Sequence, residues 1–435
     1  MMSRRSSQSM RRAGLLALAL MAAGAPSVQA RIARRYVISE LGAVGDGQTK
    51  NTTAIQAAID RCSGEGGGIV AVPKGTFLTG ALFLKKGVRL QVEEAGVLLG
   101  SADPDDYPQV HTRWEGIERD WTSALINAIG LTDVEVSGSG VIDGAGEQWL
   151  QRFPRQPSPQ QPKPSEAEPA AALRTGRPRL ICFQSCRGVR LAQLTLRNQA
   201  VWCVHVLYSE NVVLEDLTIR AAHTIPSSDG IDVDSSRRVR IRRCDIDVND
   251  DCISIKSGKD ADGLRVNRPS EDIVIEKCRF GYGHGGVAMG SETSGGIRNV
   301  EVRQCLMEAD NWAPIRFKSQ PSRGGVVENI TYRDIQLRDT RQAFEFNMEW
   351  RMVPPLAPPA AVLPVVRNVK LIGITGTVKS AGMIRGLKDS PIDGVTFRGC
   401  RISAQKGLVL QHVRALDLRG LLLDVSEGPA ILRRE

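Results

Sequence analysis

Aromatic residues are scarce in this 435-residue sequence, where Phe, Trp and Tyr together make up only 5%. Glycine is abundant, with 43 residues, and short runs rich in Val and Ile far outnumber segments with helical periodicity. Hydrophobic residues still amount to 42%, which is enough to bury a large core and excludes a chain that is disordered throughout. The composition therefore favours an all-β protein with many turns.

Long apolar runs are missing after the N-terminus. Residues 1–30 contain four arginines and no acidic residue, with an apolar run from Ala13 to Ala23 and the small-residue stretch Val28–Ala30. Because this run is shorter than the roughly 20 residues that span a bilayer, we predict a signal peptide over residues 1–30 rather than a membrane anchor. We expect residues 31–435 to form one domain of an exported protein, periplasmic or secreted, without membrane association.

Charge of one sign does not dominate the sequence. The 57 basic and 48 acidic residues give a net charge of +9, which falls to +5 when the segment 1–30 is left out. An excess of this size is compatible with an acidic partner but does not require one. The basic residues are dispersed and are not interleaved with aromatic residues, which argues against nucleic-acid binding.

The nine cysteines include no Cys-x-x-Cys pair, so they do not indicate a metal site. An odd number in an exported protein leaves at least one thiol unpaired. Cys182 and Cys186 are close enough in sequence to bridge locally. Four cysteines recur at the same place in a strand pattern, which favours their being small buried hydrophobic residues. They are Cys244, Cys278, Cys305 and Cys400.

A repeated motif runs along the chain. Each copy places a turn residue before an apolar-x-apolar triplet, and from Val189 onward successive copies are roughly 30 residues apart, a period within the range of solenoid repeats. The copies are Gly87–Leu90, Asp133–Val136, Gly188–Leu191, Asn211–Leu214, Arg238–Ile241, Asp272–Ile275, Asn299–Val302, Asn329–Tyr332, Asn368–Leu371 and Gly394–Phe397. This pattern is typical of stacked β coils, and the Asn-Gly turns of a β-sandwich are absent between the strands. The sequence predicts a right-handed single-stranded parallel β-helix.

The ends and interruptions fit this architecture. Residues Asn51–Thr53 can begin a helix, which we expect to cap the N-terminal end of the core. Its apolar residues fall on one face: Ile55, Ala58, Ile59 and Cys62. Two proline-rich stretches, residues 152–178 and 353–364, are predicted to be loops that project from the coils.

Acidic residues gather in consecutive coils. The segments are Ser228–Asp234, Asn249–Lys256, Gly283–Gly290 and Pro314–Lys318. Strand alternation places Asp229 level with Asp251, and Asp250 beside His284, just before the strands begin. Strict alternation would bury Asp251 in the core, where an unpaired carboxylate is costly, so we predict a bend that turns the three carboxylates toward one cleft.

Two outward rows follow from the same register. The first row is Asp232, Ser254, Ala288 and Arg316, and the second row is Asp234, Lys256, Gly290 and Lys318. With coils about 4.8 Å apart, Arg316 and Lys318 should lie roughly 10 Å from the carboxylates. An acidic centre beside basic residues suits an anionic chain molecule with a cleavable bond. Crowded carboxylates also separate each other's pKa values, which leaves one protonated donor beside ionised neighbours, as acid/base hydrolysis of a glycoside requires.

These segments carry a resemblance to a known family. Ser228–Gly230, Asn249–Asp251, Gly283–Gly285 and Arg316–Lys318 together resemble the signatures of the polygalacturonases, family 28 of the glycoside hydrolases. Gly42–Gly47 and Gly140–Gly144 extend the similarity over nearly the whole chain after the predicted signal peptide. The stretch Lys256–Gly263, with Gly295–Gly296, is most similar to the bacterial, often exo-acting branch.

The resemblance implies a parallel β-helix that hydrolyses pectin with inversion and without a metal or other cofactor. It implies Asp250 as the general acid and Asp229 and Asp251 as the pair that activates water. It further implies that His284 tunes the acid and that Arg316 and Lys318 bind a substrate carboxylate. The expected partner is an acidic plant cell-wall polysaccharide or its oligosaccharides, bound by a monomer. For an inverting pair, the Asp250 carboxyl should lie about 6.5–9.5 Å from the base.

Two departures from the family pattern affect the substrate. Ser227-Ser228 stands where Asn-Thr is usual, and Asn347–Trp350 stands where a substrate-binding Tyr is usual. Trp350 could stack on a sugar, but Glu349 would repel a galacturonate. Rhamnogalacturonan or a substituted galacturonan therefore remains an alternative substrate.

Several of these residues have two possible roles, and two further functions compete with hydrolysis. Arg316 and Lys318 could pair with Asp232, Asp234 or Glu345 instead of substrate, and Lys256 could contact substrate or form a salt bridge. Trp202, in register with Asp229 one coil earlier, suits core packing or sugar stacking. A calcium-dependent pectate lyase and a non-catalytic carbohydrate-binding solenoid are the competing functions.

Overall fold

The computed structural model describes residues 34–152, 176–308, 310–350 and 360–435. The predicted signal peptide and most of the two predicted proline-rich loops lie outside these residues. Arg34–Glu435 forms one compact unit. No helix among the described residues is long and apolar enough to cross a membrane.

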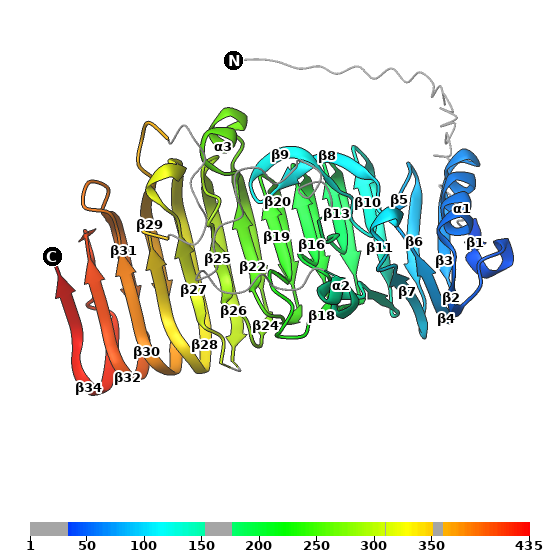
Figure 1. The fold of residues 1–435 in the computed structure, drawn as a ribbon. Helices are drawn as coiled ribbons and strands as arrows, with labels where there is room; N and C mark the ends of the chain where they lie inside the picture. The colour runs from blue at the N-terminus through cyan, green and yellow to red at the C-terminus, as the bar shows by residue number, and fades with distance from the viewer. Residues whose placement is uncertain (1–33, 153–175, 309, 351–359) are drawn as a thin grey trace, which may run out of the picture. The chain divides into compact units, whose positions relative to one another are not determined.

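The strands follow one another as parallel rungs, three to a coil, so that each pairs with the corresponding strand of the next coil (Figure 1). This confirms the predicted right-handed parallel β-helix. The first of its three sheets carries the predicted acidic segments. It consists of β5 (Leu82–Phe83), β10 (Ile126–Ile129), β13 (Ile181–Gln184), β16 (Val204–Leu207), β19 (Ile231–Asp234), β22 (Asp251–Lys256), β25 (Gly285–Met289), β27 (Ala313–Lys318), the end of β28 (Val326–Asn347), and the ends of β30 (Thr375–Arg385), β32 (Cys400–Gln411) and β34 (Leu421–Arg434).

The second sheet contains the repeated apolar triplets. It consists of β1 (Arg35–Val37), β3 (Gly68–Val72), β6 (Val88–Val92), β11 (Thr132–Gly138), β14 (Arg187–Ala192), β17 (Glu210–Glu215), β20 (Arg237–Arg242), β23 (Ser270–Glu276), β26 (Ile297–Met307), the start of β28, β29 (Val365–Ile372), β31 (Ile392–Arg398) and β33 (Val413–Arg414). The third begins with β2 (Asp46–Lys50), β4 (Gly75–Thr79), β7 (Gly96–Gly100), β12 (Val141–Asp143), β15 (Thr195–Arg197), β18 (Thr218–Arg220), β21 (Asp245–Asp247) and β24 (Arg279–Phe280).

The turn residue of the repeat is explained by its backbone conformation. All ten turn residues have a positive φ, from 53° at Arg238 to 77° at Gly87. Gly, Asn and Asp tolerate this left-handed conformation best, and they occupy nine of the ten positions. Successive asparagines also bond to each other, since Asn329 Nδ2 donates to Asn299 Oδ1 at 3.2 Å. The repeat is thus a backbone requirement at the entry to each strand of the second sheet.

The helix α1 (Thr52–Gly64) lies beside the first coils (Figure 1) and buries Ile55, Ala58, Ile59 and Cys62, as predicted. The expected side-chain cap is missing. The Asn51 side chain instead accepts a hydrogen bond from the Val44 amide at 2.7 Å and donates to the Val44 carbonyl at 2.9 Å. These bonds hold the chain at Val44 against the start of the helix. The remaining α-helices of the described residues are α2 (Gly146–Arg152) and α3 (Asp260–Val266).

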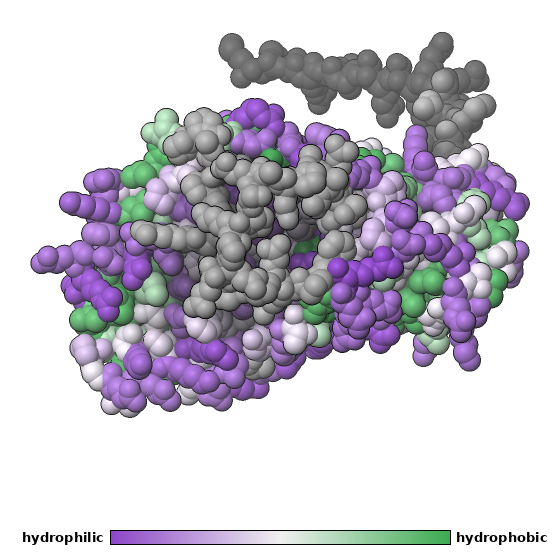
Figure 2. Space-filling model, in the orientation of Figure 1, coloured by the Kyte–Doolittle hydropathy of each residue, from purple (hydrophilic) through white to green (hydrophobic). Residues whose placement is uncertain are grey.

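All nine cysteines are buried and unpaired. Cys182 and Cys186 do not bridge. The Sγ atoms of Cys278 and Cys305 lie 3.4 and 3.3 Å from the carbonyl oxygen two residues earlier, so these thiols fill the core as small residues. Hydrophilic residues cover much of the outer surface in view, including that near the C-terminal coils (Figure 2).

Candidate active site

The acidic segments line a cavity of about 510 Å³ on the outer side of the first sheet. It extends along the stack of coils from Trp202, just before β16, to Trp350, just after β28. A cavity that crosses this many coils runs along the direction in which the strands stack. It is therefore suited to a chain molecule that lies across successive strands.

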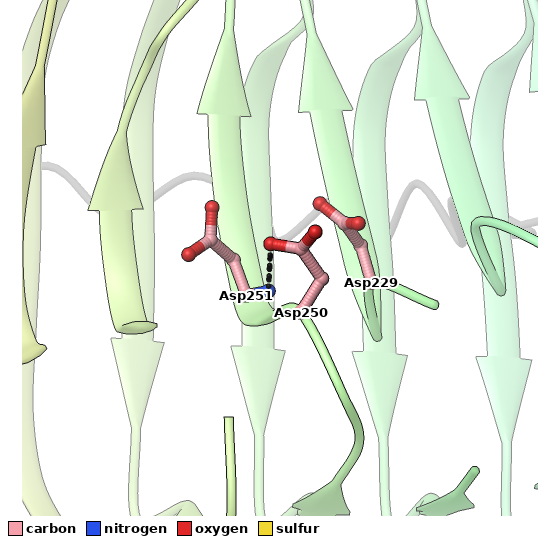
Figure 3. Close-up of side chains that lie close together, drawn as sticks. All are labelled: Asp229, Asp250 and Asp251. Atoms are coloured by element: carbon pink, nitrogen blue, oxygen red, sulfur yellow. Dashed lines mark hydrogen bonds between the residues drawn. The ribbon is translucent and has the colours of Figure 1, made fainter. Parts of the chain in front are cut away.

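Three carboxylates cluster at this cavity (Figure 3), and two of them, Asp229 and Asp250, line it. Asp229 precedes β19, Asp250 lies in a bend with Asn249, and Asp251 is the first residue of β22, so the predicted bend is present. One oxygen of each carboxylate lies within 4.8 Å of the others. The Asp250 carboxylate lies between the other two in Figure 3, and its Oδ1 accepts the Asp251 amide at 2.9 Å.

Exposure distinguishes the three. Asp251 is fully buried and Asp229 is 3% exposed, whereas the Asp250 side chain is 25% exposed. Asp250 is thus the carboxylate of the cluster that a ligand in the cavity can reach most directly. The close spacing is also shorter than the roughly 6.5–9.5 Å expected for an inverting pair, so this expectation about distance is wrong.

The predicted strand register is correct. Asp232 pairs with Ser254, Ser254 with Ala288, and Ala288 with Arg316. His284 Nδ1 lies 3.4 Å from Asp250 Oδ1, and the His284 amide donates to the Asp250 carbonyl at 3.0 Å. The imidazole is half exposed and lines the cavity beside the Asp250 carboxylate.

The cations lie much closer to the carboxylates than the expected two coil spacings, so that expectation is wrong. Lys318 Nζ donates to Asp251 Oδ2 at 2.5 Å, and Arg316 Nη1 donates to Asp251 Oδ1 at 3.0 Å. Coil spacing separates the backbones, but these long side chains reach back across the intervening strand. Arg316 Nε also donates to Glu345 at 2.7 Å, one of the pairings left open by the sequence.

These contacts separate the pKa values of the carboxyls, as the sequence predicts for crowded acids. Burial alone would raise the pKa of Asp251, but Lys318 and Arg316 lower it. Burial would likewise raise the pKa of Asp250, but the hydrogen bond from His284 and the charge of Lys318 lower it. The pKa of Asp229 is raised well above its ordinary value by burial and by Asp232 and Asp250.

The carboxyl with the raised pKa is therefore Asp229, whereas the pKa of Asp250, the acid implied by the resemblance, is lowered. Asp232 is a further buried carboxyl of this site. Its carboxyl is buried, and its pKa is raised to about 8 chiefly by burial, although Lys256 acts to lower it. Neither oxygen of Asp232 has a hydrogen-bond partner among the described residues.

Lys256 forms a salt bridge, one of its two predicted alternatives. Its Nζ lies 3.2 Å from Glu292 Oε2 and 3.6 Å from Asp232 Oδ1. It also lines the cavity, 4.8 Å from the centre of the Trp202 ring. The lysine is thus held at the surface of the cavity by two acids.

The two tryptophans predicted for substrate binding line the two ends of the cavity. Trp202 is buried against Trp114, with ring centroids 4.7 Å apart, so it packs in a cluster and also borders the cavity. Trp350 covers the cations: the Arg316 guanidinium lies 4.7 Å from its ring centre and Lys318 Nζ lies 5.6 Å away. Glu349 turns toward Arg385, at 3.8 Å.

The antiparallel hairpin of β8 (Gln109–Trp114) and β9 (Ile117–Thr122) was not predicted from the sequence. It brings Trp114 and Glu115 to the Trp202 end of the cavity, and the Gly116 carbonyl accepts the Lys259 amide at 2.9 Å. Its sequence signal is the two-residue Glu115-Gly116 turn between alternating strands. Trp312, in the coil of Arg316, was also missed and lines the cavity.

Three clustered carboxylates are also oxygen ligands of the kind that a hard cation prefers. Here, however, both oxygens of Asp251 already accept hydrogen bonds from Lys318 and Arg316. The negative charge of the oxygens that could bind a cation is therefore already partly neutralised by Lys318 and Arg316. This arrangement fits proton transfer better than cation binding.

Comparison with known proteins identifies a family. The model of glycosyl hydrolases family 28 matches residues 62–414. A probable polygalacturonase of Vitis vinifera is 31% identical, over 90% of this chain and 78% of its own. An exo-poly-alpha-D-galacturonosidase of Dickeya chrysanthemi is 30% identical, over 69% of this chain and 55% of its own. The crystal structure of an exopolygalacturonase from Thermotoga maritima has a TM-score of 0.76 at 30% identity, covering 88% of this chain and 92% of that one.

Proposed function

Because the chain belongs to family 28 of the glycosyl hydrolases, we propose that its cavity hydrolyses the α-1,4 bonds of galacturonan in pectic polysaccharides. The observation that carries the proposal is the cluster of Asp229, Asp250 and Asp251. It lies beside His284 and between cations, at one elongated cavity that Asp229 and Asp250 line. The named activities of the relatives support the same substrate class.

Asp250 is the proton donor in this proposal. Its side chain is the most exposed of the three carboxyls, and His284 lies beside it. Lys318 and Lys256 are among the groups that lower its pKa in the free cavity. A substrate carboxylate bound near these lysines would offset their charge and raise the pKa of Asp250. Asp250 would then take up a proton before it protonates the leaving oxygen.

Asp251 is the base that accepts a proton from water, together with Asp229 once Asp229 has lost its own. Lys318 and Arg316 keep Asp251 ionised, as a base requires. The inverting course rests on the family resemblance, because the short distance between the carboxylates does not by itself favour inversion.

We expect the first-formed reducing ends to be β-galacturonate, the inverted anomer. Proton NMR during the first minutes of polygalacturonate digestion, compared with the rate of mutarotation, measures this. An initial α anomer would refute inversion, and unsaturated products would show elimination instead of hydrolysis. A control with a chelator is expected to give the same rate and the same anomer.

Galacturonan is favoured over the substituted substrates by the position of Glu349. Its carboxylate lies 3.8 Å from Arg385, so the charge that would repel a galacturonate is partly balanced. Ser228, at the other departure from the family pattern, is buried and donates to the Ile225 carbonyl at 2.9 Å, whereas Ser227 lines the cavity. Contact between Ser227 and a substituent is the remaining route to a variant substrate.

Attack from the end of a chain is part of the proposal. The β8–β9 hairpin and the cluster of Trp114, Trp121 and Trp202 stand at one end of the cavity, next to the coil of Asp229. A chain lying along the cavity would meet this wall close to the catalytic carboxylates. Export, a monomeric state, and the lack of membrane or nucleic-acid partners remain predictions from the sequence.

The Lys318→Met variant tests two roles of this lysine, which are binding of a substrate carboxylate and lowering of the pKa of Asp251. Methionine retains an apolar stem but removes the charge, and kcat/KM on polygalacturonate is expected to fall roughly ten- to a hundredfold, the worth of a charge-assisted hydrogen bond. Because Lys318 lowers the pKa of Asp251, the acidic limb of the pH profile should move to higher pH.

A methyl-esterified substrate distinguishes direct contact from the effect on Asp251. A larger loss on the acidic than on the esterified substrate is expected if Lys318 also binds a carboxylate. Equal losses would show that the lysine acts only through Asp251. Lys370→Met, on the exposed face of β29, is the matched control and should leave both activities unchanged.

A further inference from the structure

A second cavity, of about 430 Å³, adjoins the catalytic one on the same sheet. It lies over β28, β30, β32 and β34, and Trp312 lines both cavities. Trp312 is 42% exposed, which is unusual for a tryptophan in this chain. Four basic residues contribute to the lining: Arg341, Lys379, Arg385 and Arg434. The two cavities thus form consecutive parts of one surface that runs from the carboxylates toward the last coils.

The basic residues of this surface follow the coils with a regular spacing. In the strand register, Lys318 is followed by Asn347, Arg385, Gln411 and Arg434 in successive coils. A cation therefore alternates with a neutral residue. With coils about 4.8 Å apart, successive cations of this row stand roughly 10 Å apart along the axis of the coils.

The cations of the second cavity are less fully paired than those of the catalytic cavity. Lys379 Nζ lies 2.7 Å from Asp310, and Arg385 lies 3.8 Å from Glu349. The Nε of Arg385 is buried without a hydrogen-bond partner among the described residues. Arg434 is exposed and forms no ion pair within the described part of the chain. Four cations here face two acids, so the surface carries an excess of positive charge.

We propose that the second cavity is a distal subsite for the carboxylates of a uronate chain, several sugars away from the bond that is cut; the inference rests on the proposed function. In an extended 1,4-linked chain whose sugars turn over at each residue, alternate carboxylates point to the same side. Two hexose lengths are close to two coil spacings, so Lys318, Arg385 and Arg434 match alternate carboxylates. Trp312 offers a ring face for a sugar between the two cavities.

The subsite lies on the opposite side of the carboxylates from the β8–β9 hairpin. A long chain would therefore keep its uncut part on the distal subsite while its end meets the hairpin. Longer, unesterified chains should bind more tightly than short ones, because only they reach Arg385 and Arg434.

The test replaces Arg434 by glutamine and compares a long and a short substrate. For Arg434→Gln, kcat/KM on polygalacturonate relative to kcat/KM on digalacturonate should fall about two- to fivefold, as expected for one exposed charge pair. The double variant Arg385→Gln/Arg434→Gln should lower the ratio further, and raising the salt concentration should shrink the differences.

Arg433→Gln is the matched control. It removes the same charge from the neighbouring position of β34, which is in register with the core residue Leu410 and does not line the second cavity. Its ratio should equal that of the unchanged protein. Equal losses in Arg433→Gln and Arg434→Gln, or a loss by Arg434→Gln that is the same on both substrates, would overturn the subsite.

A measurement of polygalacturonate binding shows whether the subsite proposal or the proposed function has failed. Retardation of the protein in a gel that contains polygalacturonate measures affinity without turnover. If the unchanged protein cleaves no galacturonan, the proposed function fails, yet weaker retardation of Arg434→Gln than of Arg433→Gln would still support the subsite. Equal retardation of the two variants would refute it.

Discussion

Replacing Asp250 by asparagine is expected to lower kcat on polygalacturonate by about 10²–10⁴-fold, the usual contribution of a positioned acid or base. The amide has nearly the same volume but cannot protonate the leaving oxygen. Asn Oδ1 can still accept the Asp251 amide, a contact of 2.9 Å in the present structure, so the bend before β22 should persist. Substrate binding should change little.

Asp247→Asn is the matched control for this variant. Asp247 lies in β21 of the same coil and also contacts a histidine, with 2.6 Å between its Oδ1 and His223 Nε2, but it does not line the catalytic cavity. Its kcat should stay near that of the unchanged protein. If Asp250→Asn kept more than about a tenth of the original rate, Asp250 would not be the donor.

Replacing Asp251 by asparagine is expected to reduce both activity and stability. The loss of the base should lower kcat by about 10²–10⁴-fold. The change also leaves Lys318 and Arg316, both nearly buried, without their shared carboxylate. Breaking a buried pair costs about 3–5 kcal/mol, and we expect a value near the lower end because Arg316 keeps Glu345.

Thermal unfolding and kcat measured well below the melting temperature separate these two effects. Because the pKa of Asp251 is lowered in the folded chain, the stability that its carboxylate contributes is present above the unfolded pKa of about 3.9 and is lost as the pH falls. The difference in Tm between the original and the variant protein should therefore shrink in acid.

Asp232→Asn is the matched control for Asp251→Asn. Its carboxyl is equally buried, but with a pKa of about 8 it carries a proton at pH 5–7, so an amide replaces a neutral group. A small change in kcat is expected. An Asp251→Asn protein that stays active while Asp229→Asn is inactive would transfer the role of base to Asp229.

The architecture could be predicted from the sequence because one backbone requirement recurs in every coil. Positions such as Asn299 and Asn329 need a left-handed φ, and the apolar residues after them alternate with the strand. The same alternation was sufficient to align Asp232 with Arg316 across the intervening strands. Strand register is thus encoded locally in this fold.

Side-chain reach and distant contacts could not be predicted in the same way. Register separates Lys318 from Asp251 by two coils, and only the conformation of the lysine shows that the two touch. The raised pKa of Asp229 depends on burial and on Asp232, which alternation does not reveal. The hairpin reaches the cavity from a part of the sequence that lies several coils before Asp229.

Product analysis of polygalacturonate and rhamnogalacturonan digests, run side by side, tests the central claim that this cavity hydrolyses galacturonan. We predict that polygalacturonate yields saturated galacturonate products of one small size from the earliest times, as chain-end attack requires, while rhamnogalacturonan stays intact. Cleavage of rhamnogalacturonan with polygalacturonate left intact would contradict the claim.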